Sequence, residues 1–230
     1  MIPFEKAIKR KEELFKNLFK DNYKTIADIG CGTGSDSLAL TGLGYNVTSF
    51  DPSAQMLNKA RINAKSSGID LDFYQFGAAQ IPDDFNGKYD VVISFGNSFA
   101  NIPTEEFECS VCRCYSLLKE KGELYIQILN YKKILLEKKR IVSITTGKEK
   151  YFVRYYDFNE NQIVFNILQF DKSDPSDHQL ISTKIYPYTS NDFTPVLKKA
   201  GFKNFNYYGG FNFTPFDSQK SNDLIITAVK

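Results

Sequence analysis

Apolar and polar positions follow a helix–strand alternation along the first 140 residues of the chain. Short, largely apolar runs of strand length lie at 25–29, 46–50, 70–76, 89–95 and 123–129. Between them lie segments with the apolar spacing of amphipathic helices, at 4–20, 35–43, 53–66 and 104–119. Strands that alternate with helices through short connections are typical of a parallel sheet covered on both faces.

The pattern changes after about residue 140. The segments KYFVRYYDF, NQIVFNILQF and HQLISTKIYPY alternate apolar and polar residues with turn signals between them, which predicts a small antiparallel sheet over 141–188. Helical spacing returns at 190–200, and strands are predicted at 204–209 and 223–230. We therefore predict a Rossmann-like α/β fold whose seven-stranded, mostly parallel sheet has helices on both faces. Residues 1–140 and 189–230 would form the cofactor-binding domain, and 141–188 an inserted antiparallel substrate lid.

Charge and length narrow the class of protein. The chain has 230 residues, 29 Lys plus Arg against 27 Asp plus Glu, and a net charge of +2. Because the two signs of charge nearly balance, we expect no electrostatic field that would recruit nucleic acid or an anionic membrane. We interpret the lysines of 132–140 as a solvated helix face. The charged N-terminus lacks the apolar region of a signal peptide, and no run reaches the roughly 20 apolar residues of a membrane span. We expect a cytoplasmic protein; its oligomeric state stays open.

The cysteines do not predict a metal site. Cys109, Cys112 and Cys114 form a C-x-x-C-x-C run, but on a helix the third points away from the face shared by the first two. No second cysteine pair or histidine lies near enough in sequence to complete four ligands, so we interpret the cysteines as core residues. The single histidine, His178, has no evident partner for a nucleophilic mechanism.

The stretch TIADIGCGTGSDSLAL, residues 25–40, carries the strongest chemical signal. Glycines at 30, 32 and 34 let the chain turn sharply after a strand and let a ligand approach the backbone. The dinucleotide fingerprint needs a third glycine at position 35, which is serine here. Asp28 would repel a pyrophosphate but suits a cationic ligand, and S-adenosylmethionine carries a sulfonium and an ammonium without any phosphate.

Two residues after the second strand support an adenosine ligand. Asp51 ends that strand, where a carboxylate can accept hydrogen bonds from both ribose hydroxyls. Met56 could pack on the adenine face. Alternatively, Asp51 is only a helix-entry acid before Pro52, and Met56 is only a core residue.

The runs D-x-G-C-G-T-G and V-T-S-F-D-P-S-A-Q-M-L resemble class I S-adenosylmethionine-dependent methyltransferases, nearest the glycine N-methyltransferase group. The resemblance continues through GNSFANI (96–102), LLKEKGELYIQILNY (117–131), KIYPYTSNDF (184–193) and YYGGF (207–211), and so covers most of the chain.

This resemblance implies S-adenosylmethionine as cofactor and gives a role to particular positions. The residues implied at the cofactor are Asp28, Gly30, Cys31, Gly32, Gly34, Asp51, Pro52, Met56, Gly77, Ala78, Ala79, Ser94 and Phe95. The residues implied at a small-molecule methyl acceptor are Asn97, Ser98, Asn130, Tyr131, Tyr186 and Tyr188. No catalytic acid or base is implied, because aligning the acceptor suffices for methyl transfer to a neutral amine.

Two positions depart from the resembled group. That group often places an acid beside adenine where this chain has Ala78, which leaves adenine to backbone groups. Glycine N-methyltransferases carry an arginine for the substrate carboxylate directly before the N-Y pair, where this chain has Leu129. Leucine cannot replace an arginine–carboxylate contact, so glycine and sarcosine are poor candidates for the acceptor.

The sequence therefore predicts an enzyme that methylates nitrogen or oxygen of a small metabolite. A nucleic-acid or protein methyltransferase is an alternative, opposed by the near-neutral charge and by SFGNSF in place of an N-P-P-Y type of motif. A non-catalytic adenosylmethionine-binding module and an NAD oxidoreductase also stay open, although Asp28 and Ser35 oppose the second of these.

Overall fold

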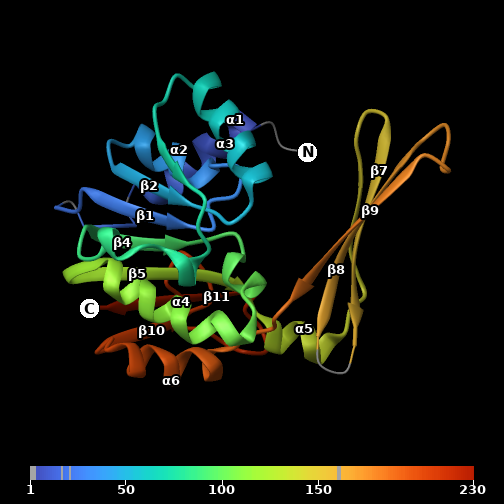
Figure 1. Ribbon diagram of the computed structural model, residues 1–230. Helices are drawn as coiled ribbons and strands as arrows, with labels where there is room; N and C mark the ends of the chain where they lie inside the picture. The colour runs from blue at the N-terminus through green and yellow to red at the C-terminus, as the bar shows by residue number, and fades with distance from the viewer. Residues whose placement is uncertain (1–3, 17, 21, 160–161) are drawn as a thin grey trace.

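A central sheet of seven strands organises the molecule (Figure 1). The computed structural model describes residues 4–16, 18–20, 22–159 and 162–230. The strand order is β10-β11-β5-β4-β1-β2-β3, and every neighbouring pair is parallel except those made by β11. The bounds are β1 (Thr25–Ile29), β2 (Asn46–Phe50), β3 (Asp72–Tyr74), β4 (Tyr89–Ser94), β5 (Leu118–Leu129), β10 (Asn204–Tyr208) and β11 (Asp223–Val229). The predicted seven-stranded, mostly parallel sheet is confirmed.

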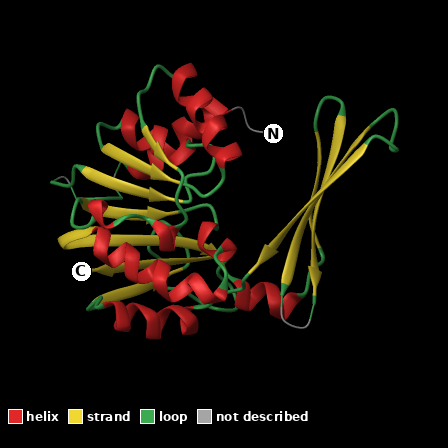
Figure 2. Ribbon diagram, in the orientation of Figure 1, coloured by secondary structure: helices red, strands yellow, loops and turns green. Residues whose placement is uncertain are grey.

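Helices cover both faces of this sheet, as predicted (Figure 2). They are α1 (Phe4–Phe15), α2 (Ser35–Gly42), α3 (Ala54–Ser66), α4 (Thr104–Leu117), α5 (Tyr131–Glu137) and α6 (Ser190–Ala200). Helices α1 and α2 pack on one face of the sheet, whereas α4 and α6 pack on the other. The helix predicted over 4–20 is shorter and ends at Phe15, although Leu18 and Phe19 remain buried in the same core. Residue 17 of that prediction lies outside the described residues.

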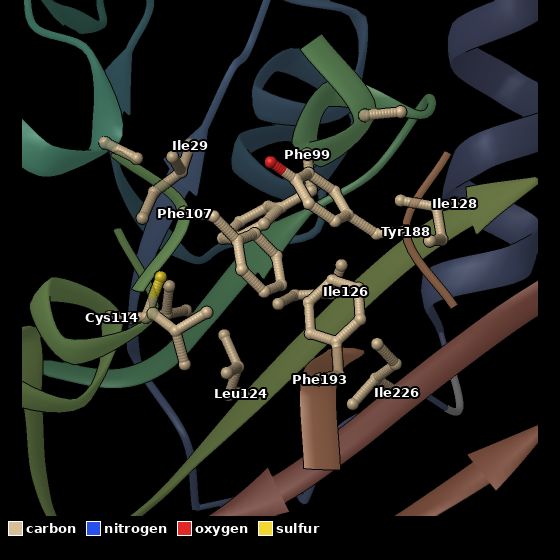
Figure 3. Packing of buried hydrophobic residues seen from close by; sticks show 14 of the residues in the cluster. Ile29, Phe99, Phe107, Cys114, Leu124, Ile126, Ile128, Tyr188, Phe193 and Ile226 are labelled. Atoms are coloured by element: carbon tan, nitrogen blue, oxygen red, sulfur yellow. The ribbon is translucent and has the colours of Figure 1, made fainter. Parts of the chain in front are cut away.

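The core under α4 and α6 is rich in aromatic residues (Figure 3). Phe99, Phe107 and Phe193 are buried there, and the ring of Phe107 stacks on that of Tyr188 with centroids 3.9 Å apart. Burying one phenylalanine side chain stabilises a fold by about 1.5–3 kcal/mol. This cluster fixes the position of α4. The first turn of α4 contains Glu106, which lines the cavity described below.

A second, four-stranded antiparallel sheet extends away from the body of the molecule (Figure 1). We call it the arm; its strands, in spatial order, are β6 (Ile141–Thr146), β7 (Lys150–Phe158), β8 (Ile163–Asp171) and β9 (His178–Ile185). The predicted antiparallel sheet after residue 140 is therefore confirmed. The base of the arm is attached to the body, because Tyr156, Ile163 and Ile185 are buried in the main core and Tyr186 N donates to Ala100 O at 2.8 Å.

Candidate functional site

The glycine loop after β1 turns where the sequence predicts. The backbone N–H groups of Gly30 and Cys31 both donate to Phe50 O, at 2.8 and 3.0 Å, which ties the loop to the end of β2. Gly30 and Gly32 have φ angles of +73° and +56°, in the left-handed region that favours glycine. A Cβ atom on Gly30 would lie 2.6 Å from Ser98 Cβ, whereas one on Gly32 would meet no atom within 4 Å. Gly30 thus allows close packing, and Gly32 leaves open space for a ligand.

Asp51 lies at the end of β2 with its carboxylate beside this loop. One oxygen accepts from Gly32 N at 2.9 Å and the other from Ser53 N at 2.8 Å. No described cationic side chain forms a salt bridge with it. Because each carboxylate oxygen has a further lone pair, both can still accept a hydrogen bond from a ribose hydroxyl. The helix-entry alternative describes only part of this geometry, since Asp51 fixes the loop as well as the entry to α3.

A cavity of about 850 Å³ opens beside Asp51 and extends to the base of the arm. Its volume suits a cofactor together with part of a second molecule. The residues that line it and were predicted for the cofactor or acceptor are Gly30, Gly32, Asp51, Pro52, Met56, Gly77, Ala78, Ser94, Asn97, Ser98 and Tyr131. Met56 is 44% exposed, so the alternative that it is a core residue is wrong.

Five residues predicted at the cofactor lie outside the cavity lining: Asp28, Cys31, Gly34, Ala79 and Phe95. Cys31 is buried, and its burial raises the pKa of the thiol. The ring of Phe95 packs instead between those of Phe15 and Phe211, at centroid distances of 5.8 and 5.0 Å. Gly34 precedes α2 and approaches Ala60 of α3. Cys31 and Gly34 thus belong to the glycine loop, Phe95 belongs to the core beneath α1, and Ala79 lies in the turn Ala78–Gln80, where its two neighbours line the cavity.

Asp28 belongs to a buried network behind the glycine loop. Its carboxylate accepts from Ser37 Oγ at 2.6 Å, and Ser49 Oγ donates to Ser37 Oγ at 2.8 Å. Burial, and then the nearby Asp36 carboxylate, raise the pKa of Asp28 to about 7. Asp36 itself forms an ion pair with Lys11 of α1 at 2.6 Å. The geometry gives Asp28 a supporting role beneath the loop, since it does not reach the cavity surface.

Three residues predicted at the acceptor also lie elsewhere. Asn130 is buried and caps α5: its Nδ2 donates to Ser218 O and Ser221 O, and its Oδ1 accepts from Lys133 N. Tyr188 is packed in the aromatic core (Figure 3), and its hydroxyl donates to Ile102 O at 2.9 Å. Tyr186 stacks beside it and lies outside the cavity lining. None of the three lies in a strand: Asn130 caps α5, and Tyr186 and Tyr188 follow the end of β9. The directions of their side chains are therefore set by how the connecting segments pack, which the sequence pattern does not specify.

Further residues line the cavity that were not predicted one by one as cofactor or acceptor residues, although residues 141–188 as a whole were predicted as a lid. The arm contributes Tyr156, Phe165, Thr183 and Ile185, and the segment that leads into α4 contributes Asn101, Ile102 and Pro103. Gln80 and Glu106 form one wall, with Gln80 Nε2 donating to Glu106 Oε2 at 3.0 Å. The remaining lining residues are Ile29, Ser53, Gly96 and Leu129. The period-two pattern of the arm was a signal for such residues, but it did not distinguish the cavity face from the outer face.

The cysteines and the histidine lie apart from the cavity lining. Cys114 is buried in the core, whereas Cys109 is exposed, so the interpretation of all the cysteines as core residues is wrong for Cys109. Its exposure follows from the turn of α4, which places it on the solvent side. His178 is exposed at the start of β9. Within the described residues, no three His, Cys, Asp or Glu side chains group as metal ligands would, and no helix is long and apolar enough to cross a membrane.

Comparisons with known proteins agree with this geometry. Residues 26–122 match a family model described as a methyltransferase domain. The chain is 28% identical to the glycine/sarcosine N-methyltransferase of Aphanothece halophytica over 207 residues, which cover 88% of this chain and 75% of the relative. It is 35% identical to the ubiquinone biosynthesis O-methyltransferase of Erwinia tasmaniensis over 107 residues, 46% of this chain and 43% of that relative. The structure of the CcbJ methyltransferase from Streptomyces caelestis shares the fold, with a TM-score of 0.81, 15% identity and coverage of 99% and 96%.

The cavity residues also fit the methyl donor of such enzymes. Asp51 has lone pairs free for a ribose, the open space at Gly32 admits a ligand to the backbone, and no basic side chain that would bind a phosphate is among the described residues lining the cavity. The chain is a class I S-adenosylmethionine-dependent methyltransferase. S-adenosylmethionine is its cofactor and supplies the methyl group that the enzyme transfers.

Proposed function

We propose that the enzyme methylates an amine nitrogen of a small molecule that carries no carboxylate. One observation supports this most directly. The end of the cavity nearest the arm is lined by Leu129, Tyr131, Tyr156, Phe165, Thr183 and Ile185, none of which carries a charge. The acids that line the cavity, Asp51 and Glu106, lie beside the ends of β2 and α4, and the described lining contains no Lys, Arg or His side chain.

A carboxylate would therefore have no cationic partner among the described residues of this cavity. Taking an ionised carboxylate out of water without a partner is costly, and a bidentate arginine contact is the usual compensation. The position at which the resembled group has that arginine is Leu129, which lines the cavity. This disfavours glycine and sarcosine as substrates, although the relative from Aphanothece halophytica, whose match covers 88% of this chain, is named for them.

The same surroundings favour nitrogen over oxygen as the methyl acceptor. A neutral amine has a lone pair that can attack the methyl carbon in line as the carbon–sulfur bond breaks, and the product ammonium then loses a proton to water. A hydroxyl needs a base to remove its proton. Burial raises the pKa of both Tyr131 and Tyr156, so neither phenol serves as that base near neutral pH.

The arm would act as the substrate lid of the enzyme. Its base supplies Tyr156, Phe165, Thr183 and Ile185 to the cavity, which supports assigning residues 141–188 to the acceptor. Residues 1–140 and 189–230, which contain the sheet, Asp51 and the glycine loop, would then form the cofactor-binding domain. The aromatic rings at the lid offer apolar or cation–π contact to an amine.

Matched pairs of amines test this proposal. Tyramine and tyrosine, or ethanolamine and serine, differ by one carboxylate. We expect kcat/KM for methyl transfer to be at least about tenfold higher for the member without the carboxylate, with N-methyl product identified by mass spectrometry. Asp51→Ala, which should bind the cofactor at least about 100-fold more weakly, is the control that measures methylation not caused by the enzyme. Preferential methylation of the amino acids, or of oxygen, would contradict the proposal.

A further inference from the structure

We propose that the side chain of Gln80, held in place by Glu106, recognises the exocyclic amine of the adenine base. Both residues lie at the donor end of the cavity, so this role does not depend on the identity of the methyl acceptor. Neither residue was predicted as part of the site from the sequence. The same role gives a physical reason for glycine at position 77.

The order of the strands decides which end of the cavity holds the base. Asp51 ends β2, whose neighbours in the sheet are β1 on one side and β3 on the other. The glycine loop follows β1 and lies beside the end of β4, because Ser94 Oγ donates to Ile29 O at 2.8 Å and Ser98 Oγ donates to Gly30 O at 3.0 Å. It would therefore receive the methionine part of a ligand whose ribose lies at Asp51. The base then lies toward the end of β3, where Gly77, Ala78 and Gln80 line the cavity.

The amide of Gln80 can be oriented from its partners. Gln80 Nε2 donates to Glu106 Oε2 at 3.0 Å, and an ionised carboxylate can only accept. The amide oxygen must therefore face the other way. It faces Gly77: a Cβ atom there would overlap Gln80 Oε1, while lying 3.3 Å from Cδ and 4.0 Å from Nε2.

This arrangement presents a hydrogen-bond acceptor to the base. Among the described residues, none donates a hydrogen bond to Gln80 Oε1, so the oxygen is free for a ligand. The amine at position 6 of adenine is a donor, whereas a 6-oxopurine places an acceptor there. The amide oxygen would attract the first and repel the second, which makes Gln80 a specificity determinant for the base.

Glu106 acts through Gln80 and is a positioning residue. It lies in the first turn of α4, where a helix N-terminus favours a negative charge, and it forms no salt bridge with a described residue. Its described side-chain partner is Gln80. Removing the carboxylate would let the amide rotate or flip, so that the oxygen no longer faces Gly77.

Calorimetric titration with S-adenosylhomocysteine and its 6-oxo analogue, S-inosylhomocysteine, tests the proposal without requiring turnover. The measured quantity is the ratio of the two dissociation constants, which a general loss of stability would not change. In the wild type we expect the adenine compound to bind more tightly by at least about tenfold. We expect Gln80→Ala to reduce that ratio about tenfold, and Gln219→Ala, on an exposed loop, to leave it unchanged.

Two further sets of variants make the outcome decisive. Glu106→Leu should lower the ratio, whereas Glu106→Gln should retain it because an amide oxygen can still accept from Gln80. The matched control Glu105→Leu, at the exposed neighbour, should have no effect.

The second set moves the acceptor to position 77. Gly77 has a φ of −70°, which any residue adopts, so Gly77→Asp can be tolerated where Gln80 is shortened. The double variant Gly77→Asp/Gln80→Ala should regain the preference for adenine.

The outcomes separate the subsite from the site as a whole. An unchanged ratio in Gln80→Ala, with both ligands still bound, overturns the role of Gln80. A wild type that does not distinguish the two ligands overturns it as well. Failure of the wild type to bind S-adenosylhomocysteine at all would instead contradict the placement of the cofactor in this cavity, and with it the subsite.

Discussion

The side chain of Asn97 is hydrogen-bonded to the hydroxyl of Tyr131, with Asn97 Nδ2 2.6 Å from Tyr131 Oη. Asn97 Oδ1 accepts from Leu129 N at 2.9 Å, which fixes the orientation of the amide. Tyr131 Oη is therefore the acceptor in its bond with Asn97. Its own proton is left free to donate into the cavity that the residue lines. Asn97 also has a φ of +68°, a conformation that asparagine tolerates better than most residues.

Replacing Tyr131 with phenylalanine removes that donor while keeping the ring. We expect kcat/KM for the preferred amine to fall about tenfold, as one lost hydrogen bond near 1.4 kcal/mol would give. The affinity for S-adenosylhomocysteine should stay within about twofold in a calorimetric titration, because Tyr131 lies at the end of the cavity that we propose for the acceptor. Tyr115→Phe, remote from the cavity, is the matched control. A loss confined to cofactor affinity would contradict this placement of Tyr131.

Asp51 should contribute directly to cofactor affinity. Asp51→Ala removes a carboxylate that fixes Gly32 N and can accept from the ribose, so we expect S-adenosylhomocysteine affinity to fall by at least about 100-fold. The exposed Asp70→Ala variant should bind as the wild type does. Isothermal titration calorimetry measures both, and wild-type affinity in Asp51→Ala would contradict the assignment of the ribose.

Asp28 should affect the pH dependence of stability more than ligand binding. Its folded-state pKa of about 7 lies above the value near 3.9 of an unfolded aspartate, because burial and Asp36 disfavour the charge. Between these values the native state binds more protons, so its stability falls as pH rises from about 4 to about 7.

The variant Asp28→Asn should lack this decline. In urea unfolding between pH 4.5 and pH 8, its free energy of unfolding relative to the wild type should become more favourable as pH rises. The amide oxygen of this variant can still accept from Ser37, so S-adenosylhomocysteine affinity at pH 8 should change little. Parallel pH profiles for the two proteins would contradict the raised pKa.

Adding a cation at the acceptor end should change the class of substrate. Leu129 is half-buried at the end of β5 and lines the cavity. We expect Leu129→Arg to raise kcat/KM for glycine relative to an uncharged amine by at least about tenfold, since arginine can pair with a carboxylate. Leu129→Met, which changes the shape without adding a charge, should not shift the preference. An equal shift in both variants would contradict the electrostatic explanation.

The loop at Gly30 and the position of Asp51 illustrate how much of the site could be predicted locally. A strand, a glycine turn and an acid at the end of the next strand are brought together by the parallel pairing of neighbouring strands, which the apolar pattern predicted. Tyr188 and Asn130 could not be assigned in this way. Whether Tyr188 packs against Phe107 or faces a cavity depends on how segments that are distant in the sequence pack together. The sequence pattern around residue 188 fits both outcomes.

The sequence by itself determined the alternation of strands and helices, the change to an antiparallel sheet near residue 140, and the chemistry of the glycine loop. These follow from periodicity and from backbone conformations that depend on residues close together along the chain. Only the tertiary structure decided that Gln80 meets Glu106 and that Tyr156 and Ile185 of the arm line the same cavity as Asp51. Those contacts join residues far apart in the chain, so their geometry is set by the packing of α4 and the arm on the sheet.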